Sequence, residues 1–239
     1  MIVYGRNPVF EALRGRRAKA VKEIWATAAA AREPWLKPTN PTITTAEEIE
    51  RRCGSSAHQG VCAEAGRYEY VDADLLLAGR EPLIVLLDQV QDPQNLGSIC
   101  RTAECAGADG VVIPERRAAE VTPAVCKASA GAVEHLPIAR VRNVADLLAD
   151  ARGAGCWCYG ASAADAALAR EPIAYDAADY TGAGVVLVLG SEGSGLRPRV
   201  AKACDELVAL PLLGRMQSLG VSAAAAALLY EILRQRRGG

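Results

Sequence analysis

An uninterrupted apolar run, Leu83 to Leu87, constrains the fold of this chain more than any other segment. The run does not alternate apolar with polar residues, which is typical of a strand buried on both faces of a parallel sheet. Further strands are expected over residues 110–113, 135–141, 156–159, 184–189 and 207–210. Helical patterns occupy residues 95–106, 122–130, 143–152 and 221–237. Strands and helices that alternate in this way predict an α/β fold with a mostly parallel sheet.

Residues 1–70 have the pattern of a separate small α/β domain. Strands are expected over 21–26 and 59–65, and the spacing of Thr45 and Glu48 is that of a capping box, which predicts a helix that ends at Gly54. The pattern weakens over residues 71–81, which we expect to be a linker. A larger domain is then expected over residues 82–239.

The composition excludes several classes of protein. The chain has 239 residues, of which 51% are hydrophobic and 23% charged, as in an ordinary globular protein. No segment reaches about 18 consecutive apolar residues, so no membrane span is expected. The first residues lack the basic and apolar regions of a signal peptide, so a cytoplasmic location is expected.

The eight cysteines do not indicate a disulfide framework or a metal site. No two of them form a CxxC pair, and the two histidines, His58 and His135, are far apart in the sequence. This spacing disfavours zinc, so we expect no metal and interpret the cysteines as reduced and mostly buried thiols. His135 lies among apolar residues and is interpreted as structural.

Basic residues gather near the start of the chain, although the formal net charge is only −1. That net charge argues against a protein that coats nucleic acid nonspecifically, because such binding depends on many contacts between basic side chains and phosphates. The cluster is either an RNA-facing patch or a set of solvated helix ends. Its candidate RNA-binding residues are Arg6, Arg14, Arg16 and Arg17.

Loops at the carboxyl ends of parallel strands usually bind the ligand of such a sheet. The first informative loop follows the strand at 83–87 and leads to Asn95, which is expected to cap a helix that carries Arg101. An arginine in an otherwise uncharged stretch is suited to binding a phosphate. The alternative is an ordinary surface arginine.

The second informative loop is glycine-rich and runs from Gly190 to Gly195, with Glu192 as its one carboxylate. Glycines here indicate either a backbone that lies close to a ligand or a tight turn. The loop does not match G-x-G-x-x-G, and no acidic residue follows at the distance that a dinucleotide site requires. It also lies too late in the chain for the glycine motif of an ordinary methyltransferase.

The third informative segment, residues 210–224, leads from a strand into the last helix, with Ser218 or Ser222 available as a cap. By their order and spacing, the three segments closely resemble the motifs of the SpoU (TrmH-like) branch of the SPOUT RNA methyltransferases. This resemblance covers about residues 82–239. Residues 1–70, with Tyr4-Gly5-Arg6-Asn7-Pro8-Val9 and His58-Gln59-Gly60-Val61, resemble the small α/β (L30e-like) substrate-binding domain of the rRNA-modifying members.

The resemblance implies a ribose 2′-O-methyltransferase that acts on a guanosine in the peptidyl-transferase loop of 23S rRNA. It also implies a deep trefoil knot, an exception to the usual topology, a homodimer that uses the final helices, and S-adenosylmethionine bound in the knot. The cofactor-binding residues that it implies are Leu189, Gly190, Gly195, Leu210, Leu212, Ser218 and Leu219. The catalytic positions that it implies are Asn95, Arg101, Glu192 and Ser218, while His58 is interpreted as a turn or an RNA contact.

The implied chemistry is attack of a ribose hydroxyl on a sulfonium methyl group, which requires no metal. Alignment of the reacting atoms contributes much of the rate, and a proton must leave the hydroxyl. We expect Arg101 to hold the target phosphate beside the ribose, with Glu192 and Asn95 ordering the site. A role for Arg101 as the base is less favoured because the pKa of arginine lies above about 12.

One position departs from the family pattern. Gly220 stands where most relatives have Asn, so the role of an amide side chain there is lost. Two alternatives stay open: an enzyme that acts on tRNA or another rRNA nucleotide, and an RNA-binding relative without catalysis. Only Gly220 supports the inactive relative, and the presence of Arg101 and Glu192 argues against it.

Overall fold

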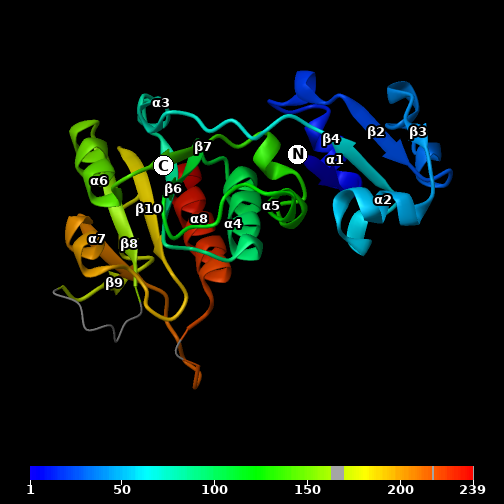
Figure 1. Cartoon of the computed structure of the whole chain (residues 1–239). Coiled ribbons are helices and arrows are strands. Elements are labelled where there is room, and N and C mark those ends of the chain that lie inside the picture. The colour runs from blue at the N-terminus through cyan, green and yellow to red at the C-terminus, as the bar shows by residue number, and fades with distance from the viewer. Residues whose placement is uncertain (163–169, 217, 239) are drawn as a thin grey trace. The chain divides into compact units, whose positions relative to one another are not determined.

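The computed structural model describes residues 1–162, 170–216 and 218–238. The chain forms two compact units, each with its own sheet (Figure 1). The small unit comprises Met1–Glu69 and Glu120–His135, and the large unit comprises Tyr70–Ala119 and Leu136–Gly239.

The small unit is built on a four-stranded sheet of order β1-β4-β2-β3. Its strands are β1 (Ile2–Tyr4), β2 (Glu23–Ala26), β3 (Thr42–Ile43) and β4 (Val61–Glu64). The strand β4 is antiparallel to both β1 and β2, whereas β3 is parallel to β2. The helices α1 (Arg6–Ala12) and α2 (Ala46–Cys53) and four short 3-10 turns, Ala18–Ala20, Ala30–Arg32, Lys37–Thr39 and Ser56–His58, complete residues 1–69.

Helix α2 begins and ends as its sequence predicts. The Glu48 N–H donates to Oγ1 of the cap residue Thr45 at 3.3 Å, and Gly54 ends the helix with a left-handed φ of 68°. This confirms the predicted cap and stop. Ile49 on the helix packs with Trp25 and Cys62 of the sheet, so one face of α2 closes the small core.

The segment Glu120–His135 belongs to the small unit by its contacts, although the predicted ranges place it in the large domain. It contains α5 (Pro123–Ala128), which Thr122 caps, and a 3-10 turn over Ala132–Glu134. The buried carboxylate of Glu134 binds Arg17, and its backbone carbonyl accepts from the Arg16 N–H at 2.8 Å. A long-range ion pair of this kind leaves no local sequence signal.

In the described part of the large unit, seven strands form one parallel sheet in the order β7-β6-β5-β10-β8-β11-β9. They are β5 (Leu83–Asp88), β6 (Gly110–Pro114), β7 (Ile138–Val141), β8 (Cys156–Ala161), β9 (Ile173–Ala174), β10 (Gly184–Gly190) and β11 (Glu206–Ala209). Every residue of β5 is buried, as its unbroken apolar run predicts. The predicted parallel α/β class is therefore confirmed, while the implied knot stays a prediction.

Helices cover both faces of this sheet (Figure 1). They are α3 (Ala73–Leu77), α4 (Pro93–Cys105), α6 (Val144–Gly153), α7 (Pro198–Ala203) and α8 (Val221–Gly238). Helix α4 packs against α8, and α6 packs against α7. None of the helices in the described ranges is long and apolar enough to cross a membrane.

Three local predictions need correction. Residues 71–81 are not a plain linker, because α3 lies within them and its Leu76 and Leu77 are buried in the core of the large unit. Helix α4 is capped by Asp92, whose Oδ1 accepts from the Gln94 N–H at 3.0 Å, and not by Asn95. Pro93 explains the earlier start, since proline suits the first helical position. Strand β7 begins only at Ile138, because the residues before it turn.

Candidate active site

A cavity of about 420 Å³ lies in the large unit, where the carboxyl ends of β8, β10 and β11 meet the start of α8. Its size is within the usual range for a site that binds a small molecule. Strand ends and the glycine loop contribute Ala161, Ser162, Leu189, Gly190, Ser191, Glu192, Gly193, Ser194, Gly195, Leu196 and Val208. The segment after β11 and the helix α8 contribute Leu210, Leu212, Ser218, Leu219, Gly220, Val221, Ala224 and Leu228.

The glycine loop folds back on itself at one edge of the cavity. Ser191 and Gly195 exchange two backbone hydrogen bonds of 3.1 and 3.0 Å. A Cβ on Gly190 would lie 2.2 Å from the carbonyl carbon of Gly195, so only glycine fits there. The loop is therefore a tight turn whose backbone lines the cavity, and its approach to a ligand stays a prediction.

Residues 210–216 and 218–220 form another edge of the cavity and are largely exposed. Leu213 and Met216 are 97% and 78% exposed. Gly220 has a φ of +83°, and its N–H donates to Ser218 Oγ at 3.2 Å. A Cβ on Gly220 would lie 3.9 Å from Glu192 Oε1, so the two loops bring Glu192 and Gly220 close to each other.

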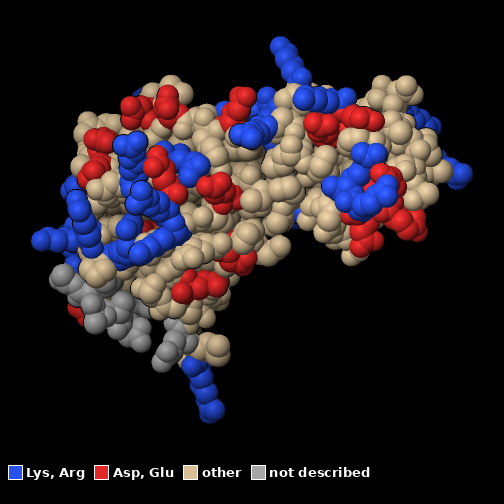
Figure 2. All heavy atoms as spheres, in the orientation of Figure 1, with Lys and Arg blue, Asp and Glu red and all other residues tan. Residues whose placement is uncertain are grey.

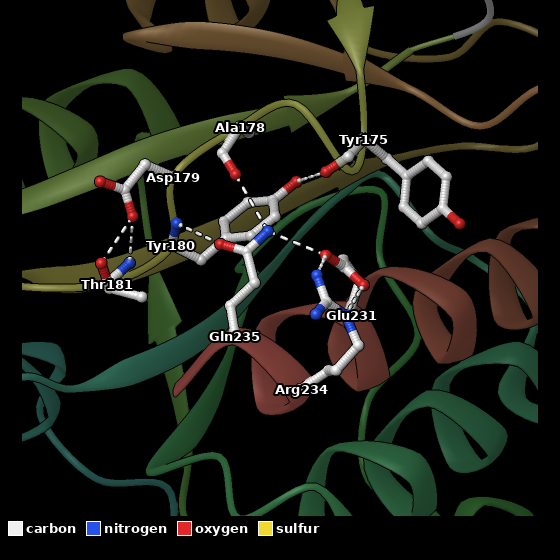
Figure 3. A network of polar contacts seen from close by, with 8 residues as sticks. All are labelled: Tyr175, Ala178, Asp179, Tyr180, Thr181, Glu231, Arg234 and Gln235. Carbon is white, nitrogen blue, oxygen red and sulfur yellow. Dashed lines mark hydrogen bonds and ion pairs between the residues drawn. The ribbon is translucent and has the colours of Figure 1, made fainter. Parts of the chain in front are cut away.

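A polar network fixes the far end of α8, the helix whose first turns line the cavity (Figure 3). Gln235 Oε1 accepts from the Tyr180 N–H at 3.1 Å, and Gln235 Nε2 donates to the Ala178 carbonyl at 3.1 Å. Glu231 accepts from Arg234 at 2.7 and 2.8 Å and from Gln235 at 2.8 Å. The hydrogen bond from Arg234, followed by that from Gln235, lowers the pKa of Glu231 to about 2. The wall of the cavity is therefore tied to the loop before β10.

The cavity brings together every residue that the family resemblance implies for cofactor binding. Leu189, Gly190 and Gly195 come from β10 and the glycine loop, and Leu210, Leu212, Ser218 and Leu219 come from the other edge. Glu192 also lies in the lining. The structure therefore places these residues around one cavity, and the role of each residue stays a prediction.

Among the described residues, the lining of the cavity includes neither Asn95 nor Arg101. Both lie on α4, which follows β5, and β5 pairs with β10 so that Asp88 faces Gly190. Arg101 is exposed and Asn95 is half-buried. Six positions apart on the helix, they are separated by about 9 Å along its axis and point from different sides. A substrate would therefore have to extend along α4 to meet both.

The candidate RNA-binding residues of the small unit differ in availability. Arg6, Arg14 and Arg16 are exposed, and Arg6 also pairs with Glu33 at 2.9 Å. Arg17 is wrong as an RNA contact, because it is only 5% exposed. Its guanidinium binds both carboxylate oxygens of Glu134 and the Gly66 carbonyl.

The two histidines are bound within the small unit. His58 is buried, and its Nδ1 accepts from the Gly60 N–H at 2.9 Å, which fits the turn interpretation. His135 Nε2 lies 2.7 Å from Glu11 Oε2, in keeping with a structural role.

Other polar residues beside the cavity escaped prediction from the sequence. Asp88 and Arg197 form a close ion pair at the base of the glycine loop, and Ser162 lines the cavity from the end of β8. The rule that ligands bind at strand ends could have indicated Asp88 and Ser162. Within the described ranges, no group of three or more His, Cys, Asp or Glu side chains is arranged to hold a metal ion.

Comparison with known proteins places this geometry in a family. The model of the SpoU rRNA methylase family matches residues 82–230, and that of the RNA 2′-O ribose methyltransferase substrate-binding domain matches residues 2–71. The chain therefore belongs to the SpoU family of RNA methyltransferases. Bacillus subtilis YacO, assigned to the TrmH family of tRNA/rRNA methyltransferases, is 38% identical over 246 residues, which cover 98% of this chain and 95% of YacO.

Solved structures agree with that membership. The SpoU methyltransferase AviRb from Streptomyces viridochromogenes, solved in complex with AdoMet, has a TM-score of 0.82 and 27% identity, over 100% of this chain and 91% of its own. The AdoMet-bound rRNA methyltransferase from Sinorhizobium meliloti has a TM-score of 0.78 and 25% identity, over 98% of this chain and 86% of its own. The similarity thus extends over both units.

Proposed function

We propose that this protein transfers a methyl group from S-adenosylmethionine to a ribose 2′-hydroxyl of RNA, with S-adenosylmethionine bound in the 420 Å³ cavity. The observation that carries the proposal is that the two loops implied by the family resemblance meet around one cavity of suitable size. The AdoMet-bound structures of AviRb and of the Sinorhizobium meliloti enzyme support the same ligand.

The cavity suits that ligand in shape and in polarity. The tight approach of Gly190 to Gly195 leaves backbone at the surface of the cavity, where a ligand can lie against it. Leucines from both edges provide apolar contacts, and the serines and the Glu192 carboxylate provide polar ones. Bound S-adenosylmethionine would supply an electrophilic methyl group.

The chain's own task is then to position the ribose 2′-hydroxyl for attack on that methyl group. Arg101 is exposed, and no ion pair is found for it among the described residues, so its guanidinium is free to bind an RNA phosphate. Glu192 and Asn95 would order the site, and Ser218 supports the backbone of the loop opposite Glu192. Positioning of this kind is the main contribution that a protein makes to such a transfer.

For the substrate we propose a guanosine in the peptidyl-transferase loop of 23S rRNA. The match of residues 2–71 to a substrate-binding domain supports an RNA contact in the small unit, where Arg6, Arg14 and Arg16 are exposed. We further propose that the protein acts in the cytoplasm as a homodimer that uses α8. A tRNA substrate is the second candidate, because YacO is assigned to a family of tRNA/rRNA methyltransferases.

Two experiments test these proposals separately. Calorimetry with S-adenosylmethionine should give a one-site isotherm, and the absence of binding would refute the assignment of the cavity. Mapping of 2′-O-methylation in rRNA and tRNA from cells that lack the protein should reveal one lost methyl group in 23S rRNA. Loss of a tRNA methyl group instead would establish the second candidate.

A further inference from the structure

The last residue of β5, Asp88, holds a fully buried carboxylate. Among the residues that the structure describes, its hydrogen bonds come from Arg197, which precedes α7. Arg197 Nη2 and Nε lie 2.6 and 2.8 Å from Oδ1, and the Arg197 backbone N–H donates to Oδ2 at 3.1 Å. The pair therefore fixes both the side chain and the backbone of Arg197.

The position of this pair in the sheet links two functional segments. Asp88 faces Gly190 on the neighbouring strand, so the glycine loop leaves the sheet beside Asp88. The end of the loop contacts Asp88 again, through the backbone N–H of Arg197. After Asp88 the chain turns through Gln89, with a φ of 65°, and enters α4, which carries Arg101. One ion pair thus joins the base of the glycine loop to the start of the segment that carries the predicted phosphate contact.

Other arginines nearby also have carboxylate partners, but in a different setting. Figure 2 shows basic side chains gathered over α6 and α7. Arg199 lies 3.8 Å from Asp146, and both side chains are mostly exposed, at 78% and 68%. Such a surface pair contributes little. The Asp88 carboxylate is fully buried, and loss of its partner would leave a charge without compensation.

We propose that Asp88 and Arg197 are positioning residues that hold the glycine loop and the start of α4 in one arrangement. Neither side chain lines the cavity, so the pair acts through the backbone of the loop. Its integrity sets the affinity for S-adenosylmethionine and the alignment of that ligand with the RNA. This inference rests on the proposed function in taking S-adenosylmethionine as the ligand.

The test compares the full-length variants Arg197→Ala, Arg197→Lys and Asp88→Asn with the matched control Arg199→Ala. Calorimetry gives the Kd for S-adenosylmethionine, and a methylation assay gives kcat with both substrates saturating. We expect Arg197→Ala to weaken binding about 10- to 100-fold and to lower kcat as well, because a displaced loop misaligns the reactants. Arg197→Lys should recover part of the affinity, since lysine keeps the charge but not the planar fork. Arg199→Ala should leave both quantities unchanged.

Hydrogen exchange distinguishes a local effect from general destabilisation. In Arg197→Ala without ligand, the amides of residues 190–197 should exchange faster while those of β5 and β10 stay protected. Wild-type affinity, turnover and loop exchange in Arg197→Ala and Asp88→Asn would overturn the proposal. If Arg197→Ala does not fold, Arg197→Lys and Asp88→Asn test the proposal by the same three measurements: affinity, turnover and loop exchange. If the wild-type protein does not bind S-adenosylmethionine, the proposed function fails, and loop exchange still tests the ion pair.

Discussion

Each unit contains a fully buried carboxylate that is bound by an arginine, and one of these two pairs stands beside a loop that lines the cavity. In the small unit, Glu134 and Arg17 are 0% and 5% exposed and join residues that are far apart in sequence. In the large unit, Asp88 is 0% exposed, but Arg197 is 45% exposed and stands at the end of a loop that lines the cavity. The same chemistry therefore stabilises a fold in one place and a ligand-binding loop in the other.

The largest expected effect is on stability, in the small unit. Arg17→Ala removes the partner of a fully buried carboxylate, which we expect to lower the free energy of unfolding by about 3–5 kcal/mol. Denaturant unfolding measures the change, and Arg16→Ala, an exposed neighbour, is the control. Calorimetry on the folded fraction should give an unchanged Kd for S-adenosylmethionine. A weaker Kd would show that the two ion pairs do not differ as proposed.

The next largest effect is expected on catalysis, at Arg101, which is exposed and belongs to neither of the two ion pairs. Arg101→Ala and Arg101→Lys should lower the rate of methyl transfer by about 10²- to 10³-fold, because a charged contact to the substrate is lost or loses its geometry. Binding of S-adenosylmethionine and stability should persist, because Arg101 lies outside the cavity lining. Near-normal turnover of either variant would refute the assignment.

A smaller effect concerns the network that anchors α8 (Figure 3). The pKa of Glu231 is about 2 in the folded protein, below its ordinary value of 4.5, so its ionised form stabilises the fold at higher pH. That contribution is present above about pH 4.5 and is lost as the pH falls towards 2. The difference in unfolding free energy between wild type and Glu231→Gln should therefore shrink over this interval. Denaturant titrations at several pH values measure it, and a constant difference would contradict the assignment.

The smallest effect is expected at Gly220, where the family pattern has Asn. A φ of +83° disfavours most side chains, but Asn tolerates left-handed backbone better than others, and the nearest atom to a new Cβ is 3.9 Å away. Gly220→Asn should therefore change the Tm only slightly. Gly220→Val, the matched variant with a branched side chain, should cost about 1–2 kcal/mol. Equal Tm values for the two variants would argue against the left-handed backbone at this position.

The prediction of local elements succeeded where a single segment carries its own signal. The apolar run at 83–87 gave β5, and Thr45 with Glu48 gave the cap of α2. The prediction failed at the start of α4, where two residues can each cap the helix. Asn95 and Asp92 are both good caps, and Pro93 decided for Asp92 because proline occupies the first helical position.

The loops of the candidate site could be predicted from the sequence, but the ion pair at the base of the glycine loop could not. The glycine loop and the segment at 210–220 have distinctive residues, and the structure places both around one cavity. Asp88 and Arg197 are 109 residues apart and carry no joint pattern in the sequence. Arg17 shows the converse error, since a basic cluster in the sequence does not reveal that one member is buried against Glu134.

The sequence by itself determined the parallel α/β class, the two glycine-bearing loops and the family to which the chain belongs, because these depend on short-range pattern and residue type. Tertiary structure alone decided that the loops enclose one cavity, that Glu120–His135 belongs to the small unit, and which arginines are available to a ligand. The physical reason is that burial and ion pairing arise from contacts between distant segments, and no local pattern encodes which side chains meet.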